Sequence, residues 1–453
     1  MTRFLILKWW RKTKLKAVIQ AGGKGTRLKE ITGGGIPKPL AEMNGQPILE
    51  YQILQLKKYD VDEIYIIVNH LGEKIVDYIG DGKKYGICIH YIFEEFPMGS
   101  AGALYFLKPY IQTEDFFLVF GDIVFDIDWK RMLSFHLQNH AKVTMFVHPN
   151  SHPHDSDLIF TDKNQKVILI DSKNNKRDYW YANCVNAGLY ILSGKVLERI
   201  AYGQRMDLEH DLLSEMVKRK LDVYAYRSTE YVKDAGTVER FRNIERDIEQ
   251  MIPQKRNLLK KQRCIFLDRD GTVNQYCGLI SKEEHIVLID GVTKAIKKIN
   301  MSGYLTIIVT NQPVIARGLC TVREVEIFHQ KIETLLGEAG VYVDDIVFCP
   351  HHPDKGYPDE NPEYKVECNC RKPKTGMIEK MQEKYNIDLS KSYMIGDTTT
   401  DIMTGKNAGL KTVLLETGEG GTDGKYKVAP DWVAADLLQA INQIMGQERN
   451  DLR

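Results

Sequence analysis

The sequence predicts an α/β protein of two domains. Apolar runs of strand length alternate with helical patterns along the chain, as in folds with largely parallel sheets. A chain of 453 residues is long enough for about two to three domains. The alternation breaks at a proline followed by a basic run. We therefore expect a tail at 1–14, a first domain at 15–251, a linker at 252–262 and a second domain at 263–453.

The first half contains four expected strands and two expected helices. Each strand is a short apolar run rich in branched or aromatic side chains. The earlier helix carries Leu49, Ile53, Leu54 and Leu56, and the later one ends just before a proline. The expected strands are 16–20, 63–68, 87–93 and 116–120, and the helices are 48–58 and 237–250.

The second half repeats the alternation from residue 264 onward. Its early core strands have no long insertion between them, which argues against a large cap domain. Substrate specificity would then come from short loops, including residues 275–279. The expected strands are 264–267, 305–310, 345–348, 392–395 and 412–415.

Composition excludes several classes of partner. Basic and acidic residues nearly cancel, 62 against 61, so no global field favours nucleic acid or an anionic membrane. The eight cysteines, without a secretory signal, indicate reduced thiols or metal ligands. Residues 1–10 hold an apolar run of only four, too short for a signal core or a membrane span. We expect a cytoplasmic protein whose tail is frayed, although a basic tail with tryptophans can also touch a membrane surface. The oligomeric state is left open.

A glycine-rich turn follows the first expected strand. Gly22, Gly23 and Gly25 let backbone amides approach a triphosphate, and Thr26 and Arg27 end the turn. An ordinary strand–helix turn would look similar. The spacing is neither a Walker loop nor the usual dinucleotide fingerprint.

Three further residues favour phosphate chemistry in this half. Lys38 lies between two prolines that limit the backbone around it. Asp122 follows the strand at 116–120, at the edge where open α/β sheets bind ligands. Asp234 precedes a helix, where a single aspartate is often an N-cap. Together, the two aspartates could hold Mg²⁺ on oxygen ligands.

In this order the motifs resemble those of the sugar-phosphate nucleotidyltransferases, over about residues 16–250. The resemblance implies a Rossmann-like domain with a mixed sheet, in which a sugar 1-phosphate attacks the α-phosphorus of a nucleoside triphosphate. Arg27 and Lys38 would neutralise charge, and Asp122 and Asp234 would hold Mg²⁺. Ala235 departs from the larger aliphatic residue usual there. The resemblance also implies that Gly99 faces the base and Asn186 the sugar. The motifs are the glycine-rich turn, Pro37-Lys38-Pro39, 97–103, Gly121-Asp122, 186–190 and 234–237.

The second half opens with two aspartates that suit phosphate-ester hydrolysis. Asp268 ends the strand at 264–267 and Asp270 lies two residues on, as a nucleophile and a proton donor. Asp397 could complete a magnesium site with Asp268 and the Asp270 carbonyl. Asp401, one helical turn later, suits an orienting role. Thr310, Asn311, Arg371 and Lys372 would bind and stabilise the transferring phosphoryl group.

These positions resemble the haloacid-dehalogenase-like phosphatases over about residues 263–420. The resemblance rests on Asp-x-Asp-Gly-Thr from Asp268, then Thr310, Lys372 and Gly396-Asp397 in the family order. It implies a Rossmannoid domain with a minimal cap. The implied route is an aspartyl-phosphate at Asp268, hydrolysed with help from Asp270.

Four side chains in a loop poor in helix and strand pattern suit a structural zinc ion: Cys349, His351, Cys368 and Cys370. His352 is the weaker candidate, and unligated cysteines are the alternative. The loop, with 310–312 and 316–318, resembles the heptose-bisphosphate phosphatases and the related histidinol-phosphate phosphatases. Pro313 departs from the small polar residue usual there, which puts contacts to a distal substrate phosphate in doubt.

Together the resemblances imply consecutive steps on one sugar. The second domain would remove the C7 phosphate of D-glycero-D-manno-heptose 1,7-bisphosphate, and the first would nucleotidylate the heptose 1-phosphate. The first domain most resembles guanylyltransferases acting on the α-anomer, which implies GTP, with ATP, CTP or UTP as alternatives. The expected partners are therefore small molecules, namely a nucleoside triphosphate and heptose phosphates. Two other interpretations remain. In one, the first domain uses another sugar such as mannose 1-phosphate and is fused to a histidinol-phosphate-type phosphatase. In the other, one domain is a non-catalytic regulatory module.

Overall fold

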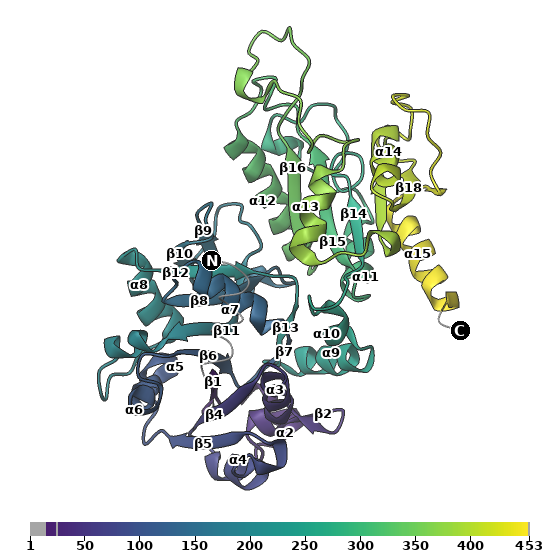
Figure 1. Ribbon diagram of the computed structural model, residues 1–453. Coiled ribbons are helices and arrows are strands. Elements are labelled where there is room, and N and C mark those ends of the chain that lie inside the picture. Colours follow the sequence, from purple (N-terminus) through teal and green to yellow (C-terminus); the bar gives the residue numbers. More distant parts are fainter. Residues whose placement is uncertain (1–14, 24–25, 452–453) are drawn as a thin grey trace. The chain divides into compact units, whose positions relative to one another are not determined.

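The computed structural model describes residues 15–23 and 26–451, and the chain divides into two compact units (Figure 1). The first unit contains residues up to His148, Ser156–Asn175 and Cys184–Asn257. The second contains Pro149–Asp155, Lys176–Asn183 and residues from Leu258 onward. The expected tail at 1–14 and Gly25 lie outside the described residues.

The first unit is built on a nine-stranded mixed sheet. Strands β6, β1, β4 and β5 are neighbours and run parallel, whereas β11 pairs antiparallel with β6 and β8. The predicted mixed sheet is confirmed. The sheet has the order β10-β9-β11-β6-β1-β4-β5, with β8 joining β11 to β12. Its strands are β1 (Leu15–Gln20), β4 (Val61–Val68), β5 (Cys88–Phe93), β6 (Asp115–Phe120), β8 (Val143–His148), β9 (Leu158–Thr161), β10 (Val167–Asp171), β11 (Val185–Ser193) and β12 (Val223–Arg227).

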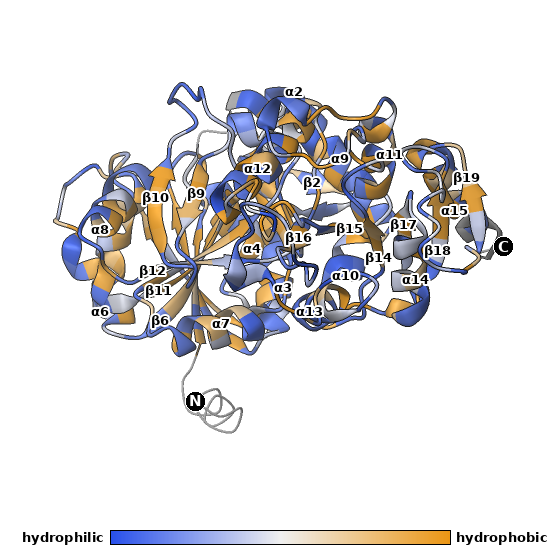
Figure 2. Ribbon diagram, turned by 90° about the horizontal axis from the view of Figure 1, so that it is seen from above, coloured by the Kyte–Doolittle hydropathy of each residue, from blue (hydrophilic) through white to orange (hydrophobic). Residues whose placement is uncertain are grey.

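Helices and two small antiparallel pairs complete this unit. The pairs are β2 (Glu42–Met43) with β3 (Gln46–Pro47), and β7 (Ile123–Asp126) with β13 (Tyr231–Asp234). Apolar side chains of β1 and β4 are buried on both faces, as a parallel sheet covered by helices requires. Figure 2 shows the apolar colour concentrated on the strands. The helices are α2 (Lys29–Thr32), α3 (Ile48–Lys57), α4 (Gly72–Ile79), α5 (Gly99–Gly102), α6 (Lys108–Ile111), α7 (Trp129–Gln138), α8 (Ser214–Lys218), α9 (Val238–Glu249) and α10 (Ile252–Arg256).

The proposed linker at 252–262 begins as a short helix. The preceding helix α9 ends at Glu249, and Pro253 lies in the first turn of α10, where its missing N–H costs nothing. Lys260 and Lys261 are exposed, as expected of a solvated basic run. Arg256, in contrast, is buried, and its Nε donates to the carbonyl of Thr229 at 2.9 Å. Part of the linker therefore packs into the first unit.

The second unit contains a six-stranded, wholly parallel sheet of order β16-β15-β14-β17-β18-β19. This confirms the Rossmannoid prediction. The strands are β14 (Cys264–Leu267), β15 (Leu305–Asn311), β16 (Asp345–Cys349), β17 (Tyr393–Gly396), β18 (Lys411–Leu415) and β19 (Trp432–Ala434), and the helices are α11 (Val292–Asn300), α12 (Val322–Glu338), α13 (Gly376–Tyr385), α14 (Thr399–Asn407) and α15 (Leu437–Asp451).

Among the described residues, every helix is too short or too polar to cross a membrane.

Candidate active sites

A pocket of about 510 Å³ lies at the carboxyl ends of β1, β4 and β6 in the first unit. The carboxyl edge of a parallel sheet is where open α/β folds bind ligands. Six residues singled out from the sequence line it, and they come from four separate stretches of chain: Gly22, Gly23, Arg27, Lys38, Gly99 and Asp122. The structure thus brings the predicted triphosphate loop and three of the four predicted charged residues, Arg27, Lys38 and Asp122, into one cavity, whereas Asp234 is not among the residues that line it. Thr26, whose side chain is not described, immediately precedes Arg27.

Close approaches leave little room for a side chain at two of these glycines. A Cβ on Gly22 would lie 2.8 Å from Oε2 of Glu94, so any side chain would displace that carboxylate. Gly99 has a φ of +79°, and a Cβ there would lie 2.5 Å from the carbonyl oxygen of Met206. Only glycine fits both the conformation and the space at residue 99.

Asp122 in the pocket and Asp234 nearby each form an ion pair with a basic side chain. Lys38 Nζ lies 2.5 Å from Oδ2 of Asp122, which directs the lysine toward the edge of β6. Asp234 ends β13, and its Oδ1 accepts from Arg240 Nη1 at 2.9 Å and from the Gly236 N–H at 3.0 Å. The Ala235 N–H donates to the carbonyl of Asp122 at 2.8 Å, so the two stretches are adjacent. A magnesium ion held by Asp122 and Asp234 would replace part of the Arg240 contact.

Glu94 is a pocket residue that the sequence reasoning missed. It follows β5, lines the cavity and accepts from the Met98 N–H at 3.2 Å. Burial raises the pKa of its carboxyl group, partly offset by the Met98 and Asn69 hydrogen bonds. Its position at the end of a parallel strand, just before residues 97–103, is the signal that would have identified it.

Asn186, the predicted sugar contact, belongs to a buried polar cluster. Its Nδ2 donates to the Tyr190 hydroxyl at 2.6 Å and to Oε1 of Glu209 at 3.1 Å. Burial raises the pKa of Glu209 to about 7. Asn186 is not among the residues that line the described pocket. Its role in binding sugar therefore stays a prediction.

Three buried carboxylates meet in the second unit. Asp268 follows β14, Asp397 follows β17, and Asp401 lies in the first turn of α14. One carboxylate oxygen from each lies within 4.8 Å of the others. The neighbouring strands β14 and β17 place the first two at the same edge of the sheet.

The electrostatics of this cluster fit a bound cation. Burial, then the Asp401 charge, raises the pKa of Asp268 to about 7, although Lys372 opposes the shift. Burial, then Asp268 and Asp401, raises the pKa of Asp397 to about 8. Oδ1 of Asp397 is buried without a hydrogen-bond partner, while Oδ2 accepts from the Glu419 N–H at 2.8 Å. A buried carboxylate oxygen without a partner, among like charges, is what an oxygen-ligated Mg²⁺ would satisfy.

Lys372 connects the cluster to the loop before α13. Its buried Nζ lies 2.8 Å from Oδ1 of Asp268 and 2.6 Å from Oδ1 of Asp401. The charges of Asp268 and Asp401 raise the pKa of Lys372 despite its burial, so it stays cationic. The Asn311 amide pairs with the backbone of Lys372 in both directions, at 2.9 and 3.1 Å. Arg371 lies beside it, with Nη1 donating to the carbonyl of His351 at 3.2 Å.

Thr310 and Asp270 complete this second site. Thr310 is buried near the end of β15, and its Oγ1 accepts from Gln312 Nε2 at 2.9 Å. Gln312 also donates to Oδ2 of Asp270, at 3.1 Å. Burial would raise the pKa of Asp270, but the Arg269 charge and its hydrogen bonds outweigh burial and lower it.

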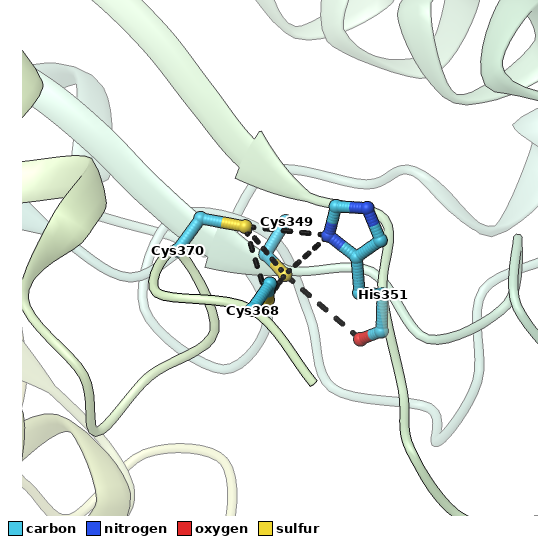
Figure 3. A group of neighbouring side chains, drawn as sticks. All are labelled: Cys349, His351, Cys368 and Cys370. Carbon is cyan, nitrogen blue, oxygen red and sulfur yellow. Dashed lines mark hydrogen bonds between the residues drawn. The ribbon is translucent and has the colours of Figure 1, made fainter. Parts of the chain in front are cut away.

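Cys349, His351, Cys368 and Cys370 gather into one cluster (Figure 3). The three sulfur atoms lie 3.2–3.5 Å apart, and His351 Nδ1 lies 3.4 Å from the Cys370 sulfur. Three thiols and an imidazole around one point fit a closed tetrahedral zinc site, in which sulfurs lie roughly 3.8 Å apart. His352 instead accepts from the Asp354 N–H at 3.2 Å.

Replacing Cys368 by serine is expected to remove zinc. The native protein should contain about one zinc per chain, because four ligands close the site. Cys368→Ser leaves three ligands and should lower the zinc content of the purified protein to a small fraction, as measured by atomic emission. Cys88→Ser, an exposed thiol in the first unit, is the matched control and should keep its zinc. An active native protein without zinc would contradict the assignment.

Comparisons with known proteins identify relatives of both halves of the chain. The nucleotidyl transferase family model matches residues 16–251, and the HAD-hydrolase-like model matches residues 369–440. A D-glycero-beta-D-manno-heptose-1,7-bisphosphate 7-phosphatase of Haemophilus ducreyi is 40% identical over 182 residues, covering 40% of this chain and 97% of that protein. The D-glycero-D-manno-heptose-1,7-bisphosphate 7-phosphatase of Chlorobaculum tepidum is 37% identical over 198 residues, covering 42% and 98%. A solved structure of HddC from Yersinia pseudotuberculosis shares 25% identity, covering 52% of this chain and 99% of that one, with a TM-score of 0.45.

Proposed function

This chain belongs to the nucleotidyl transferase family through residues 16–251 and to the heptose-1,7-bisphosphate 7-phosphatase family through its C-terminal part, and from this premise we propose that it performs two consecutive steps. The C-terminal domain removes the C7 phosphate of D-glycero-D-manno-heptose 1,7-bisphosphate. The N-terminal domain then transfers GMP from GTP to the heptose 1-phosphate, giving GDP-heptose and pyrophosphate.

Asp268 is the proposed nucleophile of the phosphatase step. Its carboxylate forms a bond to phosphorus as the bond from phosphorus to the C7 oxygen breaks, and Asp270 gives that oxygen a proton. Water then attacks the phosphorus and loses a proton to Asp270, which releases inorganic phosphate and restores Asp268. Lys372 and Thr310 stabilise the charge on the transferring group. Mg²⁺ held by Asp268, Asp397 and the Asp270 carbonyl would supply further positive charge.

Arg371, which precedes Lys372, and Arg317 are the proposed contacts for a second phosphate on the substrate. The pKa of His352 is lowered to about 4 by burial first and then by the Arg371 charge, with smaller effects from Arg317 and Lys365 and an opposing one from Asp354. The guanidinium of Arg317 lies 4.4 Å from the ring centre of Tyr357, whereas Lys365 is paired with Glu360 at 3.3 Å.

Arg27 and Lys38 are the proposed cations of the nucleotidyl step. An oxygen of the sugar 1-phosphate bonds to the α-phosphorus of the triphosphate, and the bond to the β-phosphate oxygen breaks, so that pyrophosphate leaves. Arg27 and Lys38 line the pocket where this charge develops. Asp122 and Asp234 would hold Mg²⁺, which would supply further positive charge to the phosphates. Glycines 22 and 23 allow the backbone to approach the phosphates closely.

Glu94 supports guanine as the base. A carboxylate has acceptors only, and guanine presents two adjacent donors, N1–H and the 2-amino group, on its pairing edge. Adenine offers no such pair of adjacent donors. Glu94 lies in the pocket between Gly22 and the segment around Gly99 that is expected to face the base.

Replacing Glu94 by glutamine is expected to lower kcat/KM for GTP by about 5- to 150-fold, since a two-hydrogen-bond base contact is worth about 1–3 kcal/mol. The amide presents one acceptor and one donor, and thus mismatches guanine while leaving the volume unchanged. Initial rates of pyrophosphate release with each triphosphate measure the effect. Glu95→Gln, an exposed neighbour, is the matched control. Equal losses for GTP and ATP would refute base recognition by Glu94.

One observation supports the combined function above all others: the two domains would share an intermediate, because the phosphatase product is the class of acceptor that a sugar nucleotidyltransferase uses. The test supplies the bisphosphate, Mg²⁺ and each of the four nucleoside triphosphates, with both anomers of the sugar. GDP-heptose formation would support the proposal. Phosphate release without pyrophosphate from any triphosphate would sink the two-step assignment.

A further inference from the structure

The arginine between the two catalytic aspartates is fully buried. Arg269 has an exposed fraction of 0%, although a charged side chain in an Asp-x-Asp turn is usually solvated. A buried guanidinium must find partners for its donors. The hydrogen-bond partners of Arg269 therefore indicate its role.

Arg269 holds the carboxylate of Asp270 with both ends of its fork. Nε donates to Oδ1 at 3.0 Å, and Nη2 donates to Oδ2 at 2.8 Å. Neutral amides complete the ring of donors: Asn274 Nδ2 reaches Oδ1 at 2.9 Å, and Gln312 Nε2 reaches Oδ2 at 3.1 Å. Both oxygens of Asp270 are thereby fixed in place, because a two-point contact restrains rotation as well as distance.

The other side of Arg269 is braced by two buried residues. Nη2 also donates to Oε1 of Gln312 at 2.9 Å, and Nη1 lies 3.3 Å from Nε2 of His329 on α12. Burial, then the Arg269 charge, lowers the pKa of His329 to about 3, so its ring is neutral. Because guanidinium nitrogens only donate, Nε2 of His329 must be the acceptor. His329 also packs against Phe348, with ring centres 5.1 Å apart.

We propose that Arg269, braced by His329 and Gln312, is a positioning residue that fixes the carboxyl group of Asp270 where it serves as the proton donor. None of the three is assigned a role by the steps described above. The inference rests on the proposed phosphatase function. The Arg269 charge favours the ionised carboxylate, so the protonated form of Asp270 that gives up the proton is the less populated one. In that form the two-point Arg269 contact stays, and one amide contact, from Asn274 or Gln312, gives way to the proton directed at the leaving oxygen.

This role predicts that the loss of kcat/KM on disturbing Arg269 depends on the leaving group of the ester. A sugar alkoxide is a poor leaving group and needs the proton from Asp270 as the ester bond breaks. A p-nitrophenolate leaves as a stable anion and needs almost none. The value of kcat/KM includes only the steps up to transfer of the phosphoryl group to Asp268, so it isolates this proton from the later attack by water.

The test compares kcat/KM for heptose 1,7-bisphosphate and for p-nitrophenyl phosphate in three variants of the full chain. His329→Leu removes the acceptor and should lower the ratio of kcat/KM for the bisphosphate to kcat/KM for p-nitrophenyl phosphate by about 10- to 100-fold, a part of the roughly 10²- to 10⁴-fold that general acid catalysis supplies. His329→Gln keeps an acceptor and should recover most of the ratio. Val325→Ala, a buried apolar change on the same helix, should leave the ratio unchanged.

Equal losses for both esters in His329→Leu, or no recovery in His329→Gln, would overturn the positioning role. If His329→Leu does not fold, Gln312→Met answers the same question, since it removes both the donor to Asp270 and the acceptor for Arg269. A native protein that hydrolyses neither ester would instead sink the proposed phosphatase function. The two failures are therefore distinct.

Discussion

Asp268→Asn should abolish phosphate release from heptose 1,7-bisphosphate, with a loss on the order of 10⁴-fold or more, as for removal of other catalytic nucleophiles. An amide cannot form the bond to phosphorus that the carboxylate forms. The fold should survive, because asparagine has nearly the same shape and relieves the repulsion between Asp268 and Asp401. Inorganic phosphate measured over time gives the rate.

The same variant should still nucleotidylate heptose 1-phosphate supplied directly. Asp290→Asn, an exposed aspartate in the second unit, is the matched control and should keep both activities. Loss of both activities in Asp268→Asn, with the control unaffected, would contradict two independent catalytic centres.

Asp122→Ala should have the opposite effect and lower nucleotidyl transfer by on the order of 10³-fold, as expected when several kcal/mol of charge stabilisation are lost. The change removes a proposed magnesium ligand and leaves Lys38, now 2.5 Å from Oδ2 of Asp122, without its partner in the pocket. Pyrophosphate release from GTP and heptose 1-phosphate measures the loss. Phosphate release from the bisphosphate should be unchanged, and Asp77→Ala, an exposed change in the first unit, should keep both rates.

A mixture of the two defective variants tests whether the heptose 1-phosphate intermediate is released into solution. Asp268→Asn supplies a working first domain and Asp122→Ala a working second one, so the mixture should convert the bisphosphate and GTP into GDP-heptose through the released intermediate. A mixture that stays inactive, although each variant retains its single activity, would mean that the intermediate does not pass through solution.

The candidate site residues that lie at strand ends could be predicted from the sequence. Asp122, Asp268 and Asp397 each follow an apolar run, and parallel strands place such residues at one edge of the sheet. The positive φ of Gly99 is a local feature, whereas the Met206 carbonyl that a side chain there would meet belongs to a distant part of the chain. The four zinc-ligand candidates were identifiable from residue type alone, and the fold brings them together.

Contacts between distant elements could not be predicted in this way. His329 lies 60 positions from Arg269, and nothing in its helix marks a side chain that accepts a hydrogen bond from a catalytic turn. Arg256 lies in a basic stretch, which is the sequence pattern of a solvated residue. It is nevertheless buried, because the carbonyl of Thr229, 27 positions earlier in the chain, accepts its hydrogen bond. A polar side chain is buried only where such a partner is available, whereas hydrophobic periodicity in the sequence indicates only which face of an element is apolar.

Each candidate centre draws its side chains from one half of the chain: residues 20–236 supply the first pocket, and 268–401 supply the carboxylate and lysine cluster. Neither centre borrows a group from the other stretch. A cut in the gene between these two stretches would keep each set of active-site side chains together, but it would remove Pro149–Asp155 and Lys176–Asn183 from the second unit.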